Sequence, residues 1–289
     1  MLYLILLSMR PRQWVKNAFV LPALLFSKHV LEWEYTGKAL AAACCFCLLS
    51  GAVYLLNDVA DAERDRLHPR KASRPVASGR LPASTALVAA VLVVLASTAW
   101  AFLLQREFGW VALLYGGINL AYSVHLKQVV LLDVLSVATG FLLRALGGAV
   151  VIQVPISPWF VLCSFTLALF LAVVKRRQEL VALDREAGAH RAILSQYSLP
   201  FLDQAIAVLT SATLVCYALY AMGVGEQAAG HRMQWTIPFV LYGVFRYLYV
   251  VYQKGAGDSP TAVLWADRPL QLDLILWLAV SVLGYYVLP

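Results

Sequence analysis

Three aspartates recur at close spacing in the stretch NDVADAERDRLHPRKASRP, which covers residues 57–75. Positions i, i+3 and i+7 lie on one face of a helix, so Asp58, Asp61 and Asp65 are predicted to point the same way. Converging carboxylates repel one another unless a cation lies between them. Hard oxygen ligands that leave room for water and phosphate are typical of Mg²⁺ sites. The predicted metal ligands are therefore these three aspartates together with Asn57.

The same stretch carries bases that could meet an anion held by the metal. Arg66, Lys71 and Arg74 follow the acids and can form charge-assisted hydrogen bonds with phosphate oxygens. This pattern favours a diphosphate site at the cytoplasmic mouth of a helix bundle. The alternative is a solvated loop with i,i+4 ion pairs. The acids begin at the end of an apolar segment, where they would be costly without a cation, and this favours the metal site.

The elements around this motif are those of a membrane protein. Of the 289 residues, 61% are hydrophobic and only 13% charged, against roughly 25% charged in an average soluble domain. Many runs approach the roughly 20 apolar residues that a transmembrane helix needs. We predict an all-α, polytopic bundle of about nine spans, forming one domain over residues 1–289. The predicted spans are 18–36, 38–56, 84–104, 109–125, 129–152, 157–175, 199–222, 234–252 and 269–288.

The N-terminus MLYLILLSM has no basic region before it, so we predict a short amphipathic helix on the membrane rather than a cleaved signal peptide. With this end inside, 17 of the 23 Lys and Arg residues fall in cytoplasmic loops. This bias predicts a multi-pass protein of the cell (inner) membrane whose site faces the cytoplasm. The net charge of +7 is explained by this rule and by anionic lipid, and nucleic-acid binding has no support.

The motif NDVADAERDRLHPRKASRPVASGRL resembles the first aspartate-rich motif of the UbiA superfamily of intramembrane prenyltransferases, NDxxDxxxD followed by a basic RP element. The resemblance covers nearly the whole chain, including two cytoplasmic loops, 57–83 and 175–198, which are the predicted catalytic loops. It implies an α-helical bundle around a central cavity open to the cytoplasm and lipid, and Mg²⁺-dependent transfer involving a diphosphate.

The second loop departs from the family pattern, in which a DxxxD motif usually completes the clamp on a prenyl diphosphate. Here the sequence reads KRRQEL at 175–180, with Glu179 as the remaining carboxylate. One acidic arm and one basic arm suit two phosphorylated substrates. Lys175 and Arg176 are then predicted to hold the second phosphate directly.

Four further stretches resemble the decaprenyl-phosphate phosphoribosyltransferase branch of the family. The resemblance implies that 5-phosphoribosyl-1-diphosphate donates its phosphoribosyl group to a polyprenyl phosphate, with release of diphosphate, in the supply of a cell-wall arabinan precursor. A phosphate monoester is largely ionised at pH 7, so this acceptor needs no general base. The stretches are RPRQWVKN (10–17), YSVHLK (122–127), GFLLRALGGA (140–149) and RYLYVV (246–251).

The remaining candidate substrate-binding residues are Lys16, Asn17, Tyr122, Lys127, Arg144 and Arg246. The last two fall inside predicted spans, where a central arginine costs about 2.5–3.5 kcal/mol on insertion scales. Each is therefore expected to face the cavity and contact phosphate, or else to form a structural pair with an acid or carbonyl. Lys16, Asn17 and Tyr122 could equally be topology or interface anchors, whereas function is favoured at Lys127. The sequence names no partner for Asp133.

Two other functions remain open. One is an aromatic prenyltransferase that uses a prenyl diphosphate, against which the missing second carboxylate arm argues. The other is a transporter, which would favour ionisable groups near mid-membrane rather than at one face. A homo-oligomer is compatible with the sequence.

Overall fold

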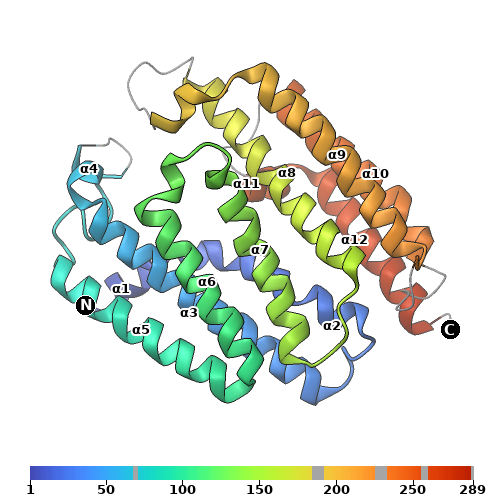
Figure 1. Cartoon of the computed structure of the whole chain (residues 1–289), viewed down its shortest axis with the longest axis horizontal. Helices are drawn as coiled ribbons and strands as arrows, with labels where there is room; N and C mark the ends of the chain where they lie inside the picture. The colour runs from blue at the N-terminus through green and yellow to red at the C-terminus, as the bar shows by residue number, and fades with distance from the viewer. Residues whose placement is uncertain (68–70, 184–191, 225–232, 255–259, 288–289) are drawn as a thin grey trace. The chain divides into compact units, whose positions relative to one another are not determined.

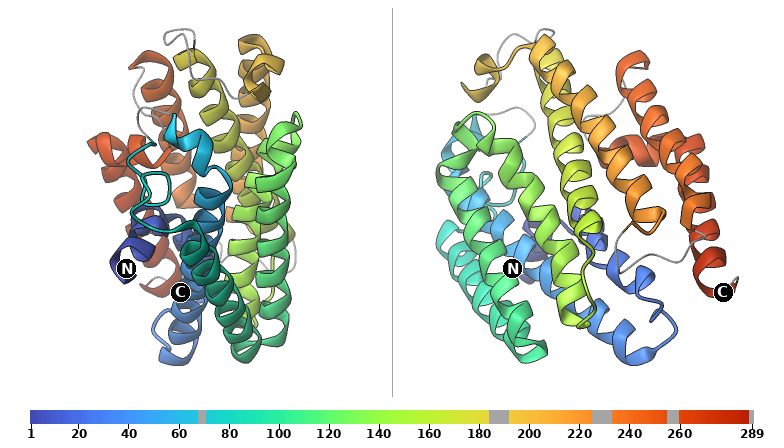
Figure 2. Two further views of the ribbon diagram at one scale, coloured as in Figure 1. Left: turned by 90° about the vertical axis from the view of Figure 1, so that its left-hand side faces the viewer. Right: turned by 45° about the vertical axis from the view of Figure 1, so that its right-hand side comes forward.

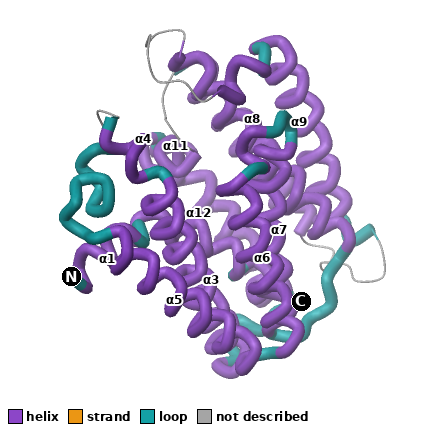
Figure 3. Tube along the Cα trace, turned by 60° about the vertical axis from the view of Figure 1, so that its left-hand side comes forward, coloured by secondary structure: helices purple, strands orange, loops and turns teal. Residues whose placement is uncertain are grey.

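The computed structural model describes residues 1–67, 71–183, 192–224, 233–254 and 260–287. Helices dominate these ranges, and no strand occurs in them (Figure 3). The chain divides into two compact units. The first comprises Met1–Leu126 and Leu143–Val154, and the second comprises Lys127–Leu142 and Pro155–Pro289. The prediction of an all-α fold is confirmed, while the single domain and the central cavity stay predictions.

The first unit is built around the long helix α3, against which α5 and α6 pack. Figure 1 shows α1, α2 and α4 at the ends of this group. Its elements are α1 (Leu2–Ser8), the 3₁₀ helix η1 (Pro11–Val20), α2 (Pro22–Phe26), α3 (Trp33–Ala60), α4 (Ala62–Arg66), α5 (Ala83–Leu104), α6 (Arg106–Val124) and the C-terminal half of α7 (Leu132–Val151).

The second unit pairs α8 with α9, and α10 with α12 (Figure 2). A buried apolar cluster that includes Phe170, Leu202 and Tyr247 joins α8, α9 and α10. The elements are η2 (Leu126–Gln128), the start of α7, α8 (Pro158–Leu183), η3 (Ala192–Gln196), α9 (Leu199–Ala221), η4 (Met233–Thr236), α10 (Ile237–Gln253), α11 (Pro260–Ala266), α12 (Arg268–Val282) and the π-helical turn η5 (Leu283–Val287).

In the part of the chain that the structure describes, five helices are long and apolar enough to cross a membrane: α3, α5, α7, α8 and α9. Leucines of α5 such as Leu92 and Leu95 are about 60% exposed, as expected for side chains that face lipid. The chain is thus a multi-pass membrane protein. The predicted count of nine spans is not confirmed, because α6, α10 and α12, with 19, 17 and 15 residues, are not among these five.

The first predicted span, 18–36, is wrong. The structure has a 3₁₀ helix that ends at Val20 and a five-residue α2 that begins at Pro22. Proline has no backbone N–H to continue the helical hydrogen bonds of the preceding turn, so the chain starts a new helix there. The left-handed conformation of Lys28, with φ of 66°, then lies between α2 and α3.

The predicted second loop also starts later than expected. Helix α8 continues to Leu183, so Lys175, Arg176 and Glu179 are helical rather than part of a loop. The hydropathy of the sequence falls at Lys175, but Lys, Arg, Gln and Glu are all good helix formers. The rest of the predicted loop up to Arg191 lies outside the described residues.

Candidate functional site

Two buried carboxylates of the first unit meet where α3 passes into α4. Asp58 lies on the last turn of α3 and Asp65 on α4, and these residues are only 2% and 3% exposed. The junction is tight because the backbone N–H of Asp61 donates to the Asn57 carbonyl and that of Asp65 to the Asp61 carbonyl. The chain therefore keeps turning after α3 ends, and this turn brings Asp65 back beside Asp58.

Three basic side chains surround this pair. Nη1 of Arg74 lies 3.3 Å from Oδ1 of Asp58 and 2.5 Å from Oδ2 of Asp65. Arg10 donates from Nη2 to the same Asp58 oxygen over 2.6 Å, and Nζ of Lys71 lies 3.7 Å from Oδ1 of Asp65. We call these five side chains the acid–base cluster. A buried charge is tolerated only when it is paired, and here both carboxylates are paired with arginine.

Arg10 was missed as a candidate residue. It has a left-handed backbone, with φ of 55°, directly before Pro11, and its guanidinium lies 4.7 Å from the centre of the Tyr54 ring. The left-handed conformation costs a non-glycine residue about 1–2 kcal/mol. The ion pair with Asp58 offsets that cost. The sequence did contain a signal, because Arg10 opens the stretch RPRQWVKN, but its spacing from Asp58 could not reveal the contact.

The structure brings together two of the three carboxylates that were predicted to converge, Asp58 and Asp65. Among the described residues, no three His, Cys, Asp or Glu side chains lie close enough together to hold a metal ion. Asp61 caps the junction of α3 and α4, Asn57 lies one residue before Asp58, and Arg66 donates from Nε to the Ala77 carbonyl. The assignment of Asn57, Asp61 and Arg66 to the site stays a prediction.

The two converging carboxylates do fit Mg²⁺. This ion is commonly held by one or two carboxylates together with water and substrate phosphate. Asp58 and Asp65 already direct oxygens to one positively charged atom, Nη1 of Arg74. Two carboxylates that meet at one positive charge are thus a donor set compatible with this ion.

A second set of polar side chains lies deep in the first unit. It includes two of the predicted site residues, Asn17 and Arg144, which are hydrogen-bonded to each other. Nε of Arg144 donates to Oδ1 of Asn17 over 2.7 Å, and its Nη2 donates to the hydroxyl of Tyr115 over 2.6 Å. The close approach depends on Gly148, where a Cβ would lie 2.0 Å from the Val20 carbonyl oxygen. Arg144 is 7% exposed, so its guanidinium fixes η1 against α6 and α7.

The two predicted phosphate-binding bases on α8, Arg176 and Lys175, differ in exposure: Arg176 is buried and Lys175 is exposed. Nη2 of Arg176 lies 2.7 Å from Oδ2 of Asp133, and Asp133 is fully buried. Arg176 also donates from Nη1 to Glu179 over 2.5 Å. Lys175 is 45% exposed and 3.6 Å from Glu179. Asp133 thus has a partner that the sequence did not reveal, and the guanidinium predicted to hold phosphate is bound to it.

Tyr197 completes the surroundings of Asp133. Its hydroxyl donates to Oδ1 of Asp133 over 2.6 Å and accepts from the backbone N–H of Leu131 over 2.8 Å. Leu131 has a left-handed φ of 67°, so this bond holds an unusual backbone turn before α7. Burial and the bond to Asp133 raise the pKa of Tyr197 to about 12, so the hydroxyl remains a donor at physiological pH.

Arg246 forms the structural pair with an acid that the sequence left as one of two alternatives. Its Nε and Nη2 each donate to Asp267 over 3.0 Å in a bidentate arrangement, and Lys254 adds a bond of 3.2 Å. Asp267 also accepts the backbone N–H of Leu270 and so caps α12. The Arg246 guanidinium lowers the pKa of Asp267 to about 2. A phosphate contact at Arg246 stays a prediction.

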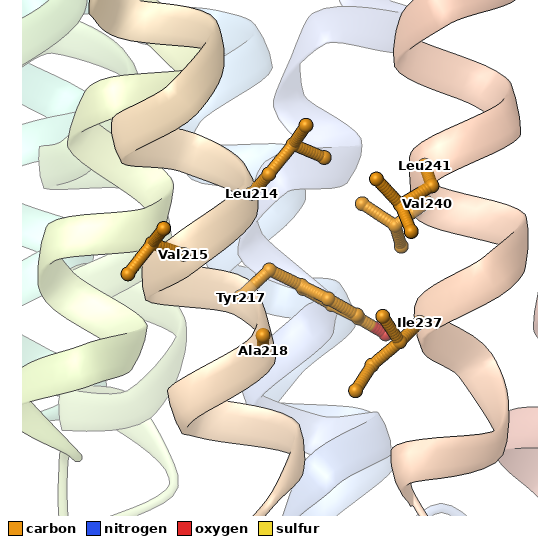
Figure 4. Close-up of a pocket in the computed structure, with 7 residues that line it drawn as sticks. All are labelled: Leu214, Val215, Tyr217, Ala218, Ile237, Val240 and Leu241. Atoms are coloured by element: carbon orange, nitrogen blue, oxygen red, sulfur yellow. The ribbon is translucent and has the colours of Figure 1, made fainter.

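The structure places Lys16 on η1, Tyr122 in the last turn of α6 and Lys127 on η2. Their predicted roles stay predictions. Figure 4 shows a separate apolar pocket between α9 and α10, which contains none of the predicted site residues. The hydroxyl of Tyr217 in this pocket is bonded to Thr236, 2.5 Å away, and to Trp277, 2.8 Å away.

Comparisons with known proteins cover almost the entire chain. The model of the UbiA prenyltransferase family matches residues 18–286. A relative from Mycolicibacterium smegmatis, named decaprenyl-phosphate phosphoribosyltransferase, is 34% identical over 284 residues, which are 94% of this chain and 89% of the relative. A relative of the same name from Mycobacterium tuberculosis is 34% identical over 280 residues, with 94% and 91% covered.

The fold has a counterpart among solved structures. A UbiA homologue from Archaeoglobus fulgidus, solved with GPP and Mg²⁺, aligns with a TM-score of 0.73 over 98% of this chain and 99% of that protein. The two sequences are 16% identical, so this likeness concerns the fold.

Proposed function

This chain belongs to the UbiA prenyltransferase family, and we propose that it is a membrane phosphoribosyltransferase within that family. Its donor is 5-phosphoribosyl-1-diphosphate, its acceptor is a polyprenyl phosphate of decaprenyl type, and its second product is diphosphate. One observation carries this proposal. The chain is 34% identical, over 94% of its length, to relatives that bear the name decaprenyl-phosphate phosphoribosyltransferase.

The acid–base cluster supports the donor site of this proposal. Asp58 and Asp65 would hold Mg²⁺, with Asn57 and Asp61 close by on the same turn. When bound, the metal would neutralise charge on the leaving diphosphate as a Lewis acid. Lys71 and Arg74 are cations beside the same carboxylates and are proposed to bind diphosphate oxygens, which suits charge-assisted hydrogen bonds.

The acceptor phosphate needs no general base from the protein. This phosphate is already largely ionised at neutral pH, so no side chain has to remove a proton from the nucleophile. Lys175 offers an exposed ammonium on α8 and is proposed to contact this phosphate. Arg176 is proposed to keep α8 in place through Asp133, since its guanidinium is 7% exposed and already engaged.

The experiment that tests the function is turnover by the purified protein in lipid nanodiscs. It is given 5-phosphoribosyl-1-diphosphate labelled in the ribose and a series of polyprenyl phosphates of different chain lengths. We expect the label to move into the lipid fraction with one equivalent of diphosphate released, and to require Mg²⁺. Transfer from a prenyl diphosphate to an aromatic acid instead would favour the ordinary prenyltransferase. No product and no diphosphate with either donor would contradict both.

A further inference from the structure

The central contact of the acid–base cluster is a single arginine atom shared by two carboxylates. Nη1 of Arg74 lies 3.3 Å from Asp58 and 2.5 Å from Asp65, although those residues come from different helices. Both carboxylates are almost fully buried, at 2% and 3% exposed. A divalent ion bound by the same two carboxylates would need the place that this atom occupies.

Cation and arginine therefore exclude each other at this position. Two like charges about 4 Å apart repel each other, and the repulsion is stronger at a site shielded from water than in bulk solvent. Arg10, Lys71 and Arg74 already supply three positive charges to two carboxylates in the acid–base cluster. Adding Mg²⁺ without moving an arginine would leave the positive charges in close contact.

The two arginines differ in how firmly they are held. Arg10 bonds only Asp58 in the acid–base cluster, and its guanidinium also stacks 4.7 Å from the Tyr54 ring centre. Arg74 bridges both carboxylates and comes from residues 71–82, which form turns before α5. The side chains of Arg74 and Arg10 are 28% and 30% exposed, so both have a route to solvent. What sets Arg74 apart is its position between the two carboxylates and its origin in these turns.

We propose that Arg74 is an exchangeable counter-ion, which holds Asp58 and Asp65 together before metal binds and moves to the diphosphate when Mg²⁺ takes its place. This inference rests on the proposed function, because it assumes a diphosphate donor. It makes Arg74 a positioning residue in one state and a substrate ligand in the other. Arg10 stays on Asp58 throughout. Metal and donor would then bind in a coupled way, since the anion stabilises the arginine that the metal displaces.

The test measures metal and donor binding separately on the full-length protein. Mn²⁺ serves as the probe, and its free concentration is read by electron paramagnetic resonance without any substrate. We expect Arg74→Gln to bind Mn²⁺ about tenfold more tightly than the unmodified protein, since tenfold corresponds to about 1.4 kcal/mol of removed competition. The same variant should bind 5-phosphoribosyl-1-diphosphate, with Mg²⁺ present, about tenfold to a hundredfold more weakly, as expected for a lost charge-assisted hydrogen bond. These opposite signs distinguish exchange from a purely structural role.

Arg80→Gln is the matched control. It removes one positive charge from the same segment, but Arg80 bonds the Ser78 hydroxyl and the Ser73 carbonyl rather than the carboxylates. Its Mn²⁺ affinity should change less than about twofold, because exposed charges are strongly screened. If Arg74→Gln does not fold, Arg74→Met gives the same test, because it keeps the aliphatic stem of the side chain but removes the positive charge that competes with the metal. Tighter Mn²⁺ and weaker donor binding are expected there too.

Two outcomes would overturn the exchange. Mn²⁺ affinity that is unchanged or lower in both Arg74 variants, or absent from the unmodified protein, rules out competition at the carboxylates. Tighter Mn²⁺ binding with unchanged donor binding rules out the movement to diphosphate. Failure of the proposed function looks different, because the Mn²⁺ result would then hold while the unmodified protein transfers no phosphoribosyl group.

Discussion

Replacing Arg176 by alanine should reduce stability far more than a surface mutation would. The substitution leaves the carboxylate of Asp133, which is fully buried, without its ion-pair partner 2.7 Å away. Breaking a buried ion pair from one side typically costs about 3–5 kcal/mol. At about 2–4 °C per kcal/mol for a domain of 150–250 residues, Tm should fall by about 6–20 °C. The hydroxyl of Tyr197 still donates to Asp133, which favours the lower part of this range.

The neighbouring residue provides the control. Lys175 is 45% exposed and lies 3.6 Å from Glu179, and exposed pairs of this kind contribute about 0–1 kcal/mol. Lys175→Ala should therefore leave Tm nearly unchanged. If Lys175 contacts the acceptor phosphate, the same variant should raise the KM for polyprenyl phosphate about 10- to 100-fold, from the loss of about 1.5–3 kcal/mol.

The assay is thermal unfolding in detergent, followed by the fluorescence of the eight tryptophans, with KM measured on the same preparations. The double variant Asp133→Leu, Arg176→Met should recover part of the lost Tm, because an apolar pair of similar size carries no unpaired buried charge. The recovery is partial because the Tyr197 hydroxyl loses its acceptor. An Arg176→Ala protein with unchanged Tm and a large rise in acceptor KM would refute this reasoning. It would restore Arg176 as the direct phosphate ligand.

Three other predictions follow from the site and the topology. Asp58→Ala should abolish Mg²⁺-dependent turnover without preventing membrane insertion. Asp61→Ala should reduce turnover less completely, because Asp58 is the residue that shares Arg74 with Asp65. Near-normal activity in both variants would contradict the metal site. Asp267→Asn should lower Tm at pH 7, and the Tm difference from the unmodified protein should shrink as pH falls from about 4 toward about 2. A carboxylate with a lowered pKa stabilises the fold above its ordinary pKa and loses this contribution as it takes up a proton. A Tm difference that does not vary with pH would exclude the ion pair as its source. Cysteines at the exposed positions Ser73 and Ser195, in a cysteine-free background, should react with an impermeant reagent only from the cytoplasmic side, and reaction of either from outside would reverse the proposed orientation.

Continuous hydrophobicity made some helices easy to predict. Residues 84–104 were expected as a span, and α5 covers Ala83–Leu104. The region 18–36 begins with an apolar run but contains Pro22, which interrupts the hydrogen bonds of a continuous helix. Hydropathy alone does not register that interruption. Hydropathy also predicted that the sixth helix would end at Lys175, the first cation of KRRQEL, although α8 continues to Leu183.

Contacts between distant residues were harder to predict than the motif itself. The spacing of Asp58 and Asp65 correctly placed them together, because both lie on one local turn of the chain. The pairing of Asp58 with Arg10 joins residues 48 positions apart, and Asp133 meets Arg176 from another helix. Such pairs depend on tertiary packing, which the local periodicity of a sequence does not encode. An acid within an apolar stretch, such as Asp133, is nevertheless a useful signal, because a buried carboxylate needs a partner.

The length of α3 has a consequence for how the enzyme would meet its lipid substrate. Asp58 follows Trp33, the first residue of this helix, by 25 positions, which corresponds to about 37 Å at 1.5 Å per residue. The hydrocarbon core of a bilayer is only about 30 Å thick. If Trp33, which is 80% exposed, marks one interface, the Asp58 carboxylate reaches the height of the lipid phosphates on the other side.

A polyprenyl phosphate would then arrive by two-dimensional diffusion, with its phosphate already at the right depth. Its encounter with the protein would depend on its surface density in the bilayer rather than on its bulk concentration. Diluting the acceptor with inert lipid, at constant total acceptor, should lower the rate, whereas diluting the whole vesicle suspension should not.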